Sequence, residues 1–599
     1  MRLVVVVAVL ALACVARAQP RLEVVETIGA TGDVHDVAVM PDGRVLAATS
    51  GGLVVIEGGR VARTITSADG LPGTRLRALD VIDGAIWAAS IEGVAELDGA
   101  LSVTRTIAIA RARRVVRAHG ALWIATYGDG LFRVRDGAPE PVTLGSDPAY
   151  ARQTDALARP DGLWIATAGR GVVRLDANGV IRGRIRQAQG LSHDLVWDLE
   201  PDGDDVLVAT LAGVSRVTAD GAITARADET RAAQRLAVRD VRTIRRAGAR
   251  TIVASWGGGV AELDGSRARP VRGASTRARA VVAQGDLTWI ADDAGLTRVE
   301  RGVAQRVLGG GLPSADLTAL ARFEGAIWIG TFDRGLARMD ASGRIEPVRV
   351  AIDRWRVDPR INDLAVTRGA EGARLWIATD RGLFVHDGRR FVPIDDPEGP
   401  GDGHVTALHV DRHGALWAAT SRVLARRDGD RWQRWSGDDA MPIAQLHAVT
   451  TDARGTVWVG SLHGLLRFDP STGRFARESV ATGALPVDWV TAVAPWRGGL
   501  LAGTYHGGLV THTSGRFVIE REGATLPCGW INPHAIETRG ERAWVGTLEG
   551  GLLVGAPGAW SRIGRDEGMP GDDVTDVLAI DEHEAWIATR AGLARVRVE

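Results

Sequence analysis

Seven polar or aromatic residues in the second half of the chain stand at matching places in a repeat of about 42 residues. They are Asp316, Arg360, His404, Gln445, Trp489, Trp530 and Asp573, and the place of Arg360 is assigned across an insertion. Indole rings stack on the apolar face of a sugar or an aromatic ligand, while carboxylate, guanidinium, amide and imidazole groups hydrogen-bond its hydroxyls. This mixture predicts a binding site for a small molecule or a glycan.

The equivalent positions in the first half of the chain form a less varied set, namely Asp33, Arg75, Arg111, Gln153, Leu195, Asp240 and Ala278. We therefore favour the second half as the part that carries the site. Trp489 and Trp530 each follow a Leu-Pro pair, so a competing interpretation is that they cap the apolar core of their own repeats.

Catalytic and metal chemistry have little support in the sequence. We find no His-Glu-x-x-His, Cys-x-x-Cys, calcium-loop or Gly-x-Ser-x-Gly pattern, and no glycine-rich loop that opens a helix. Asp316 and Asp573 are expected to be neighbours, and glycoside hydrolysis needs two carboxyl groups about 5 to 9.5 Å apart. We expect a non-catalytic protein without metal or cofactor. A carbohydrate-active enzyme, either hydrolase or lyase, is one alternative, and a structural or adhesive surface protein is another.

Charge gives no sign of a nucleic-acid or membrane surface. The 72 basic and 73 acidic side chains nearly cancel, and every basic one is Arg. Binding to nucleic acid or to anionic lipid requires a concentrated basic field, which no segment of this chain supplies. A hydrophobic content of 45% is typical of a folded globular protein.

The N-terminus has the pattern of a secretory signal. Arg2 precedes the apolar run from Leu3 to Ala13, and Ala16-Arg17-Ala18 supplies small residues for cleavage. The run is shorter than the roughly 20 residues of a membrane span. We expect residues 1–18 to be removed and the mature protein to be exported to the periplasm or the cell exterior, without an integral membrane segment.

Cys14 leaves a lipid anchor open as an alternative to simple cleavage. Lipidation signals favour Leu three positions before the cysteine, where this chain has Ala11, so the anchor is the weaker alternative. After removal of the signal only Cys528 remains, so no disulfide can form within the chain.

One phrase recurs through the whole mature chain, as in Leu122-Trp123-Ile124-Ala125-Thr126 and Ile327-Trp328-Ile329-Gly330-Thr331. Its central slot holds Trp in ten of fourteen copies and Leu or Ile in the others, at positions 46, 87, 123, 164, 207, 252, 289, 328, 376, 417, 458, 501, 544 and 586. Turn signals divide each repeat into four short strands, the pattern of a propeller blade. We predict an all-β fold of two seven-bladed β-propellers in tandem, in which the Trp rings fill the wedges between four-stranded blades and the Thr hydroxyls satisfy buried backbone groups.

The repeat also resembles a known family. The segments Gly311-Leu312-Pro313-Ser314, Trp328-Ile329-Gly330-Thr331 and Gly335-Leu336-Ala337-Arg338-Met339-Asp340 are similar to the two-component regulator propeller repeat. That repeat forms the periplasmic sensor regions of some bacterial hybrid histidine kinases, where fourteen blades form two seven-bladed propellers. The resemblance implies a sensor-like module without its kinase, or a scaffold in the cell envelope, that binds a ligand or an envelope protein.

Ring closure can be predicted from the two ends of the chain. The last repeat stops at Glu599 after three strands, and the segment from Leu22 to Ile28 resembles a fourth strand placed ahead of the first repeat. We expect residues 22–28 to close the first ring, which frees the segment from Val303 to Val307 to close the second. The two domains would then be residues 19–301 and 302–599.

Overall fold

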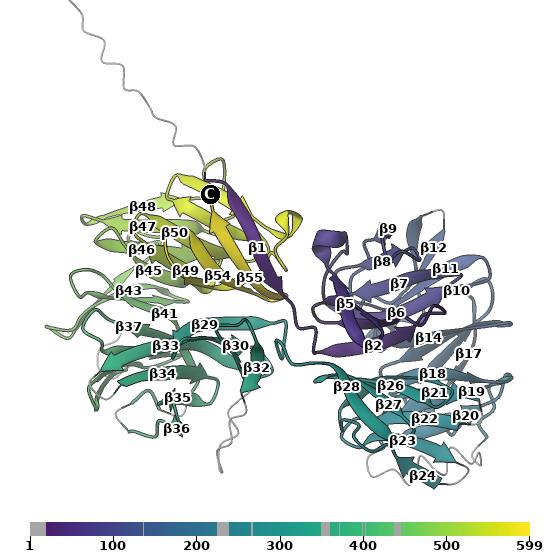
Figure 1. Ribbon diagram of the computed structural model, residues 1–599. Helices are drawn as coiled ribbons and strands as arrows, with labels where there is room; N and C mark the ends of the chain where they lie inside the picture. The colour runs from purple at the N-terminus through teal and green to yellow at the C-terminus, as the bar shows by residue number, and fades with distance from the viewer. Residues whose placement is uncertain are drawn as a thin grey trace, which may run out of the picture.

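The computed structural model describes residues 20–599 apart from 136, 225–238, 249, 265–266, 349–359, 370–371, 398, 402 and 437–444. The predicted signal segment and Cys14 therefore lie outside the described residues. The described chain forms fourteen antiparallel sheets, thirteen of four strands and one, β18 to β20, of three. The sheets are the blades of two seven-bladed propellers that stand side by side, as predicted (Figure 1).

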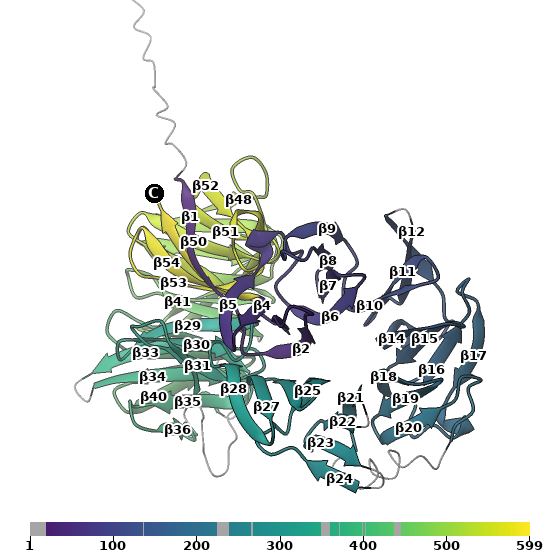
Figure 2. The same cartoon turned by 45° about the vertical axis from the view of Figure 1, so that its right-hand side comes forward.

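Nearly every blade is a meander of consecutive strands whose first strand lies nearest the axis of the ring (Figure 2). In the first propeller these innermost strands are β2 (Val34–Val39), β6 (Leu76–Ile82), β10 (Ala112–Ala118), β14 (Gln153–Arg159), β18 (Val196–Asp202), β21 (Val241–Ala247) and β25 (Ala278–Gln284). In the second propeller they are β29 (Leu317–Phe323), β33 (Ile361–Gly369), β37 (Val405–Val410), β41 (Leu446–Thr451), β45 (Val490–Trp496), β49 (Ile531–Arg539) and β53 (Val574–Ala579).

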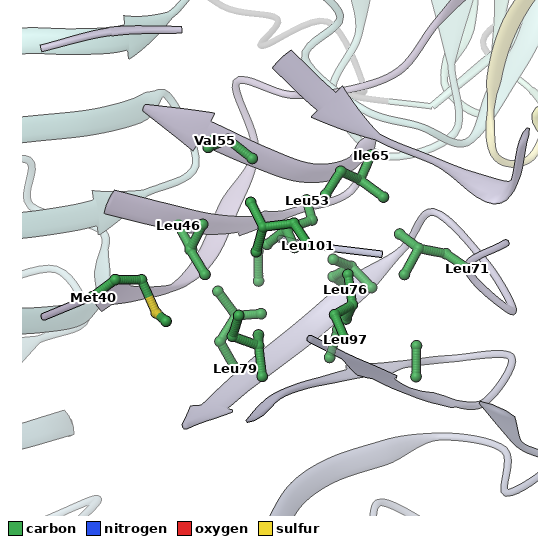
Figure 3. Close-up of a cluster of buried hydrophobic side chains, with 14 residues drawn as sticks. Met40, Leu46, Leu53, Val55, Ile65, Leu71, Leu76, Leu79, Leu97 and Leu101 are labelled. Carbon is green, nitrogen blue, oxygen red and sulfur yellow. The ribbon is translucent and has the colours of Figure 1, made fainter. Parts of the chain in front are cut away.

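Packing between blades follows the recurrent slot. All ten Trp side chains of the slot are buried, and so are the four aliphatic residues that replace Trp. Trp87, for example, packs against Val115 and Leu122 of the next blade. Figure 3 shows one such wedge, where leucines of the first and second blades interdigitate. The predicted packing role of the slot is confirmed.

The recurrent threonines also behave as predicted. The hydroxyls of Thr126 and Thr331 donate to the carbonyl oxygens of Gly130 and Gly335, each at 2.8 Å, across the turn that follows the Trp strand. Each hydroxyl thus satisfies a backbone acceptor inside the blade.

The second ring, not the first, is closed by the N-terminal strand. Strand β1 (Leu22–Ile28) pairs antiparallel with β55 (Gly592–Val598), with Leu22 opposite Val598. Together with β53 and β54 (Glu584–Thr589) they form one sheet, in which the purple β1 lies beside the yellow C-terminal strands of Figure 1. The expectation that residues 22–28 close the first ring is therefore wrong.

The segment expected to close the second ring stays in the first. Strand β28 (Val303–Gly309) pairs with β27 (Gly295–Glu300) in the seventh blade. The connecting residues Arg301 and Gly302 have φ values of 48° and 77°, as a tight two-residue hairpin turn requires, so the local strand pairs at little entropic cost. The first propeller thus extends to Gly309, beyond the expected boundary at residue 301, and its ring closes by side-chain packing of the first blade on the seventh.

The chain crosses between the propellers twice, in residues 29–33 and 310–316, and the two crossings lie side by side (Figure 1). A Cβ atom at Gly32 would lie 2.3 Å from the carbonyl oxygen of Gly310, so only glycine fits there. Further contacts join the propellers beside the crossings. Arg334 pairs with Asp293 at 2.8 Å, and the Arg565 guanidinium donates to the Pro72 carbonyl at 3.2 Å.

Substitution of Gly32 by Ala is expected to destabilise this junction. The added methyl group must push one crossing away from the other, at a cost of about 1 to 3 kcal/mol. Gly99→Ala is the matched control, because a Cβ atom there meets no atom within 4 Å. Thermal unfolding followed by calorimetry should show a lower midpoint for Gly32→Ala only. Equal midpoints for the two variants would show that the crossings do not touch as described.

Candidate functional site

A β-bulge in every innermost strand determines which side chains face the two channels. In all fourteen blades the register shifts after the first residue of that strand, as between Leu76 and Ala78 or between Val405 and Ala407. In thirteen blades one extra residue is left out of the ladder and its side chain is directed anew, and in β49 the irregularity is longer, from Ile531 to Ile536. Arg77 and Thr406 are two such residues, and both line a channel cavity.

The channel of the second propeller holds a cavity of about 280 Å³, where hydroxyl, amide, imidazole and guanidinium groups lie among the apolar surfaces of Phe332, Ile361 and Pro533. Of the residues predicted from the sequence, Arg360 and His404 line it. Both meet the same carboxylate, because Arg360 Nη1 and His404 Nε2 lie 3.4 and 3.1 Å from oxygens of Asp380. The Arg360 guanidinium also lies over the ring of Phe332, 4.4 Å from its centre.

Asp316 and Asp573 are brought together, as predicted, but through a cation. Arg590 lies between them, with Nη1 3.3 Å from Asp316 and Nε 2.8 Å from Asp573. Asn532 donates a further hydrogen bond to Asp573 at 2.5 Å. Burial raises the pKa of Asp316, against the attraction of Arg590. The Arg590 guanidinium thus forms ion pairs with both carboxylates.

Trp489 and Trp530 belong to an aromatic group at the rim of the same propeller. The Trp489 ring stacks on Tyr505 with centroids 4.2 Å apart, and the centre of the Trp530 ring lies 5.5 Å from that of Tyr505. The two indoles are 36% and 40% exposed, so neither is buried as a cap on a blade core. We call Trp489, Tyr505 and Trp530 the aromatic group.

His447 lies between the cavity and the aromatic group. It lines the cavity, and its ring centre is 6.3 Å from that of Trp489. Burial lowers the pKa of His447 to about 4, and the same cause lowers the pKa of His534, which also lines the cavity, to about 4. Both imidazoles are therefore neutral hydrogen-bonding groups at physiological pH. Gln445 stands apart, with an exposed side chain and its backbone N–H donating to the Ser421 carbonyl at 2.5 Å.

The first propeller has the larger of the two channel cavities, about 350 Å³, and sequence reasoning missed its lining. The predicted positions Arg75 and Arg111 pair with Glu92 and Asp129. The bulge places the residues two positions later, Arg77 and Arg113, in the cavity instead. A charged side chain flanked by apolar residues at the start of a strand was the available signal, and Leu76-Arg77-Ala78 shows it.

Two further observations concern the part of the chain that the structure describes. No group of three or more His, Cys, Asp or Glu residues there is arranged to hold a metal ion. None of its helices is long and apolar enough to cross a membrane.

No protein-family model matches the chain, and the comparison with curated proteins finds no match either. Solved structures do show the same fold. PorZ, described as an essential bacterial surface component of the type-IX secretion system of Porphyromonas gingivalis, is 14% identical with a TM-score of 0.58, over 96% of this chain and 86% of PorZ. An ancestral GH74 enzyme is 13% identical with a TM-score of 0.69, over 95% of this chain and 98% of the enzyme.

A third similar structure is the extracellular domain assigned to a hybrid two component system of B. thetaiotaomicron. It is 15% identical with a TM-score of 0.41, over 94% of this chain and 81% of that domain. At these identities the likeness of PorZ and of the GH74 enzyme concerns the fold alone.

Proposed function

We propose that this is an exported, non-catalytic double propeller that binds a small-molecule or glycan ligand at the channel mouth of its second propeller. The aromatic group carries this proposal. Three rings lie together, and two of them are more than one-third exposed, so part of their apolar surface faces solvent. Exposed aromatic rings beside polar groups are typical of sites for sugars and aromatic ligands.

The polar groups beside the rings complete the site. His447 leads from Trp489 to the cavity, where Arg360 and His404 share Asp380. A ligand with one ring on the indoles can place its hydroxyls toward these groups. Arg360, His404, Asp316 and Asp573 are polar residues that the sequence analysis selected, whereas His447 and Asp380 were not among them. Ligand binding without chemistry fits a sensor-like or scaffold role in the periplasm or at the cell surface. This role is supported because the repeat resembles that of sensor regions and because PorZ, a similar structure, is described as a surface component.

Glycoside hydrolysis is the rival function, since an ancestral GH74 enzyme has the same fold. In this chain the one carboxylate pair selected as a candidate is bridged by Arg590, whose guanidinium forms ion pairs with both carboxylates. The pair therefore supports a structural or ligand-orienting role. The other alternative is a structural or adhesive surface protein. In that case we expect no soluble ligand to bind at the aromatic group.

The proposal is tested by thermal shift of the purified mature protein against soluble glycans and metabolites. A ligand at 100 times its Kd should stabilise the protein by about 2.7 kcal/mol. Trp489→Ala and Trp530→Ala should remove the shift, and Trp256→Ala is the matched control, a half-buried tryptophan at the other channel. The same mixtures should show no new reducing ends.

Each alternative has its own result. Release of reducing ends that is lost in Asp316→Ala and Asp573→Ala would establish the hydrolase. If no compound shifts the protein and a pull-down recovers an envelope protein that Trp489→Ala still binds, the proposed site is wrong and the scaffold role remains.

A further inference from the structure

The bulge position has different roles in the two propellers. In the second propeller its side chains join neighbouring blades, because Thr491, Thr575 and Asn362 donate to the carbonyl oxygens of Ile531, Leu317 and Val405 at 2.8 to 2.9 Å. In the first propeller only Thr154 makes this type of bond among the described residues, to Val196 at 2.7 Å. The other six positions hold His35, Arg77, Arg113, Trp197, Arg242 and Arg279, all of which line the cavity.

Four guanidiniums therefore converge on one space of about 350 Å³, and we call Arg77, Arg113, Arg242 and Arg279 the arginine ring. Two members have carboxylate partners. Arg279 donates to Asp33 at 2.8 Å, and Arg242 donates to Asp240 at 2.7 Å while lying 3.8 Å over the ring of Trp197. These two arginines are fixed in place and neutralised.

The other two members form no direct ion pair within the described chain, although the charge of Asp33 also acts on Arg77. Arg77 donates to His35, at 2.6 Å from Nε2, and Arg113 lies over the ring of Tyr127 at 5.2 Å without donating a hydrogen bond. Burial and the nearby Arg113 lower the pKa of Arg77 to about 10. Burial lowers the pKa of Arg113 as well, with Arg279 and Arg242 adding to the effect. Burial also lowers the pKa of His35 to about 3, so the imidazole is neutral and acts only as a hydrogen-bonding group beside Arg77.

The carboxylates next to the ring are already engaged. Arg114 binds Asp80 and Asp155 at 3.0 and 2.8 Å, and these carboxylates also accept from backbone N–H groups of neighbouring blades. Burial raises the pKa of Asp80 to about 6 and that of Asp155 to about 7. Asp36 and Asp198 also line the cavity, where they pair with Arg114 and Arg245. The carboxylates beside the arginine ring are thus directed to Arg114 and Arg245, and none forms an ion pair with Arg77 or Arg113 within the described residues.

We propose that the channel of the first propeller binds an anionic ligand, with a phosphate or carboxylate group held between Arg77 and Arg113. Buried like charges without a counter-charge are unfavourable, and an anion in the cavity relieves both their repulsion and their desolvation. Guanidinium groups match the oxygens of phosphate and carboxylate in paired hydrogen bonds. This site is separate from the proposed site in the second propeller and does not depend on it.

The ligand is recognised by charge more than by stacking. The ring of Trp197 is covered by Arg242, and the ring of Trp256 has Arg277 at 4.8 Å and Arg242 at 5.4 Å. These indoles hold guanidinium groups and offer no free face comparable with the aromatic group. A cavity of about 350 Å³ suits a small molecule with one or two anionic groups.

The test uses inorganic phosphate, pyrophosphate and citrate, with glucose as the neutral control, in titrations and thermal shift at fixed ionic strength. Arg77→Gln and Arg113→Gln should each weaken binding by at least about tenfold. Both should also raise the unfolding midpoint without ligand, because each removes an uncompensated buried charge. Arg111→Gln is the matched control, since Arg111 is exposed and pairs with Asp129 outside the cavity. The ranking of pyrophosphate against citrate distinguishes phosphate from carboxylate ligands.

Three results would overturn the proposal. One is the absence of a thermal shift with any of the three anions at millimolar concentration. Another is equal weakening by Arg111→Gln and Arg113→Gln, which would indicate general surface charge. The third is a lower midpoint in ligand-free Arg77→Gln and Arg113→Gln, which would make the arginine ring a structural element. Trp489→Ala should bind the anions like the wild type, so failure of one site is distinguishable from failure of the other.

Discussion

Deletion of residues 22–28 is expected to unfold the second propeller and to leave the first propeller folded. Strand β1 supplies the fourth strand of the last blade, and its side chains Leu22 and Val24 cover the cluster around Val574 and Val596. Without it, β55 becomes an open edge and the ring loses its closing pair. The loss is comparable with the whole stability of a domain, on the order of 5 to 15 kcal/mol.

Calorimetry and near-ultraviolet circular dichroism measure this effect on the full chain. The truncated protein should retain the transition of the first propeller and lose that of the second, and a peptide with the sequence of residues 20–30 should restore it. Val24→Asp should reproduce much of the loss, whereas Val25→Asp is the control, because Val25 lies at a bulge and is 37% exposed. An unchanged second transition in the truncated protein would disprove closure by β1.

The second large effect concerns pH and the buried carboxyl of Asp363. Its oxygens accept from the backbone N–H groups of Leu364 and Leu408, at 2.7 Å each, and so join two blades. Burial raises the pKa of Asp363 from 3.8 to about 7, although these hydrogen bonds oppose the rise. His534 lies 3.9 Å away but is neutral in the range where Asp363 titrates, because its own pKa is about 4.

A carboxyl with a raised pKa in the folded state binds its proton more tightly there than in the unfolded chain. Its contribution to the free energy of unfolding is therefore greatest below about pH 4 and decreases as the pH rises to about 7. The change is on the order of 4 kcal/mol. The related carboxyl of Asp576, whose pKa burial also raises, acts in the same direction.

Denaturant unfolding at pH 5 and at pH 8, followed by tryptophan fluorescence, should show a smaller difference between the two pH values in Asp363→Asn than in the wild type. Asn cannot ionise, so the part of the pH dependence that belongs to residue 363 disappears. Asp286→Asn is the control, because that carboxylate is exposed and lies on the other propeller. If the free energy of unfolding of Asp363→Asn changes between pH 5 and pH 8 as much as that of the wild type, the pKa of Asp363 is not raised by folding.

The repeat alone predicted the blades, because burial of the Trp slot is a local requirement that each copy must satisfy. Trp87 and Trp544 occupy equivalent wedges although they are hundreds of residues apart. Ring closure was harder to predict, since Leu22 to Ile28 has the alternating pattern of a fourth strand that fits either ring. The hairpin residues Arg301 and Gly302 were the local signal that ties β28 to its own blade.

The channel lining was missed for a geometric reason. Alignment on the entry pattern selects a residue ahead of the innermost strand, and the bulge that follows adds one residue without a trace in the turn pattern. The side chains at Arg75 and Arg77 therefore exchange roles, one pairing with Glu92 and the other reaching the cavity. Both arginines are plain in the sequence, but the surroundings of each depend on the fold.

The paired crossings also determine how the two rings can move. A polypeptide that passes once between two bodies leaves them free to swivel, whereas two passes in contact at Gly32 and Gly310 oppose such a rotation. A protease that cuts one crossing leaves the two propellers joined by the other crossing. A single cut should therefore produce smaller fragments under denaturing conditions while the mass of the native protein stays the same.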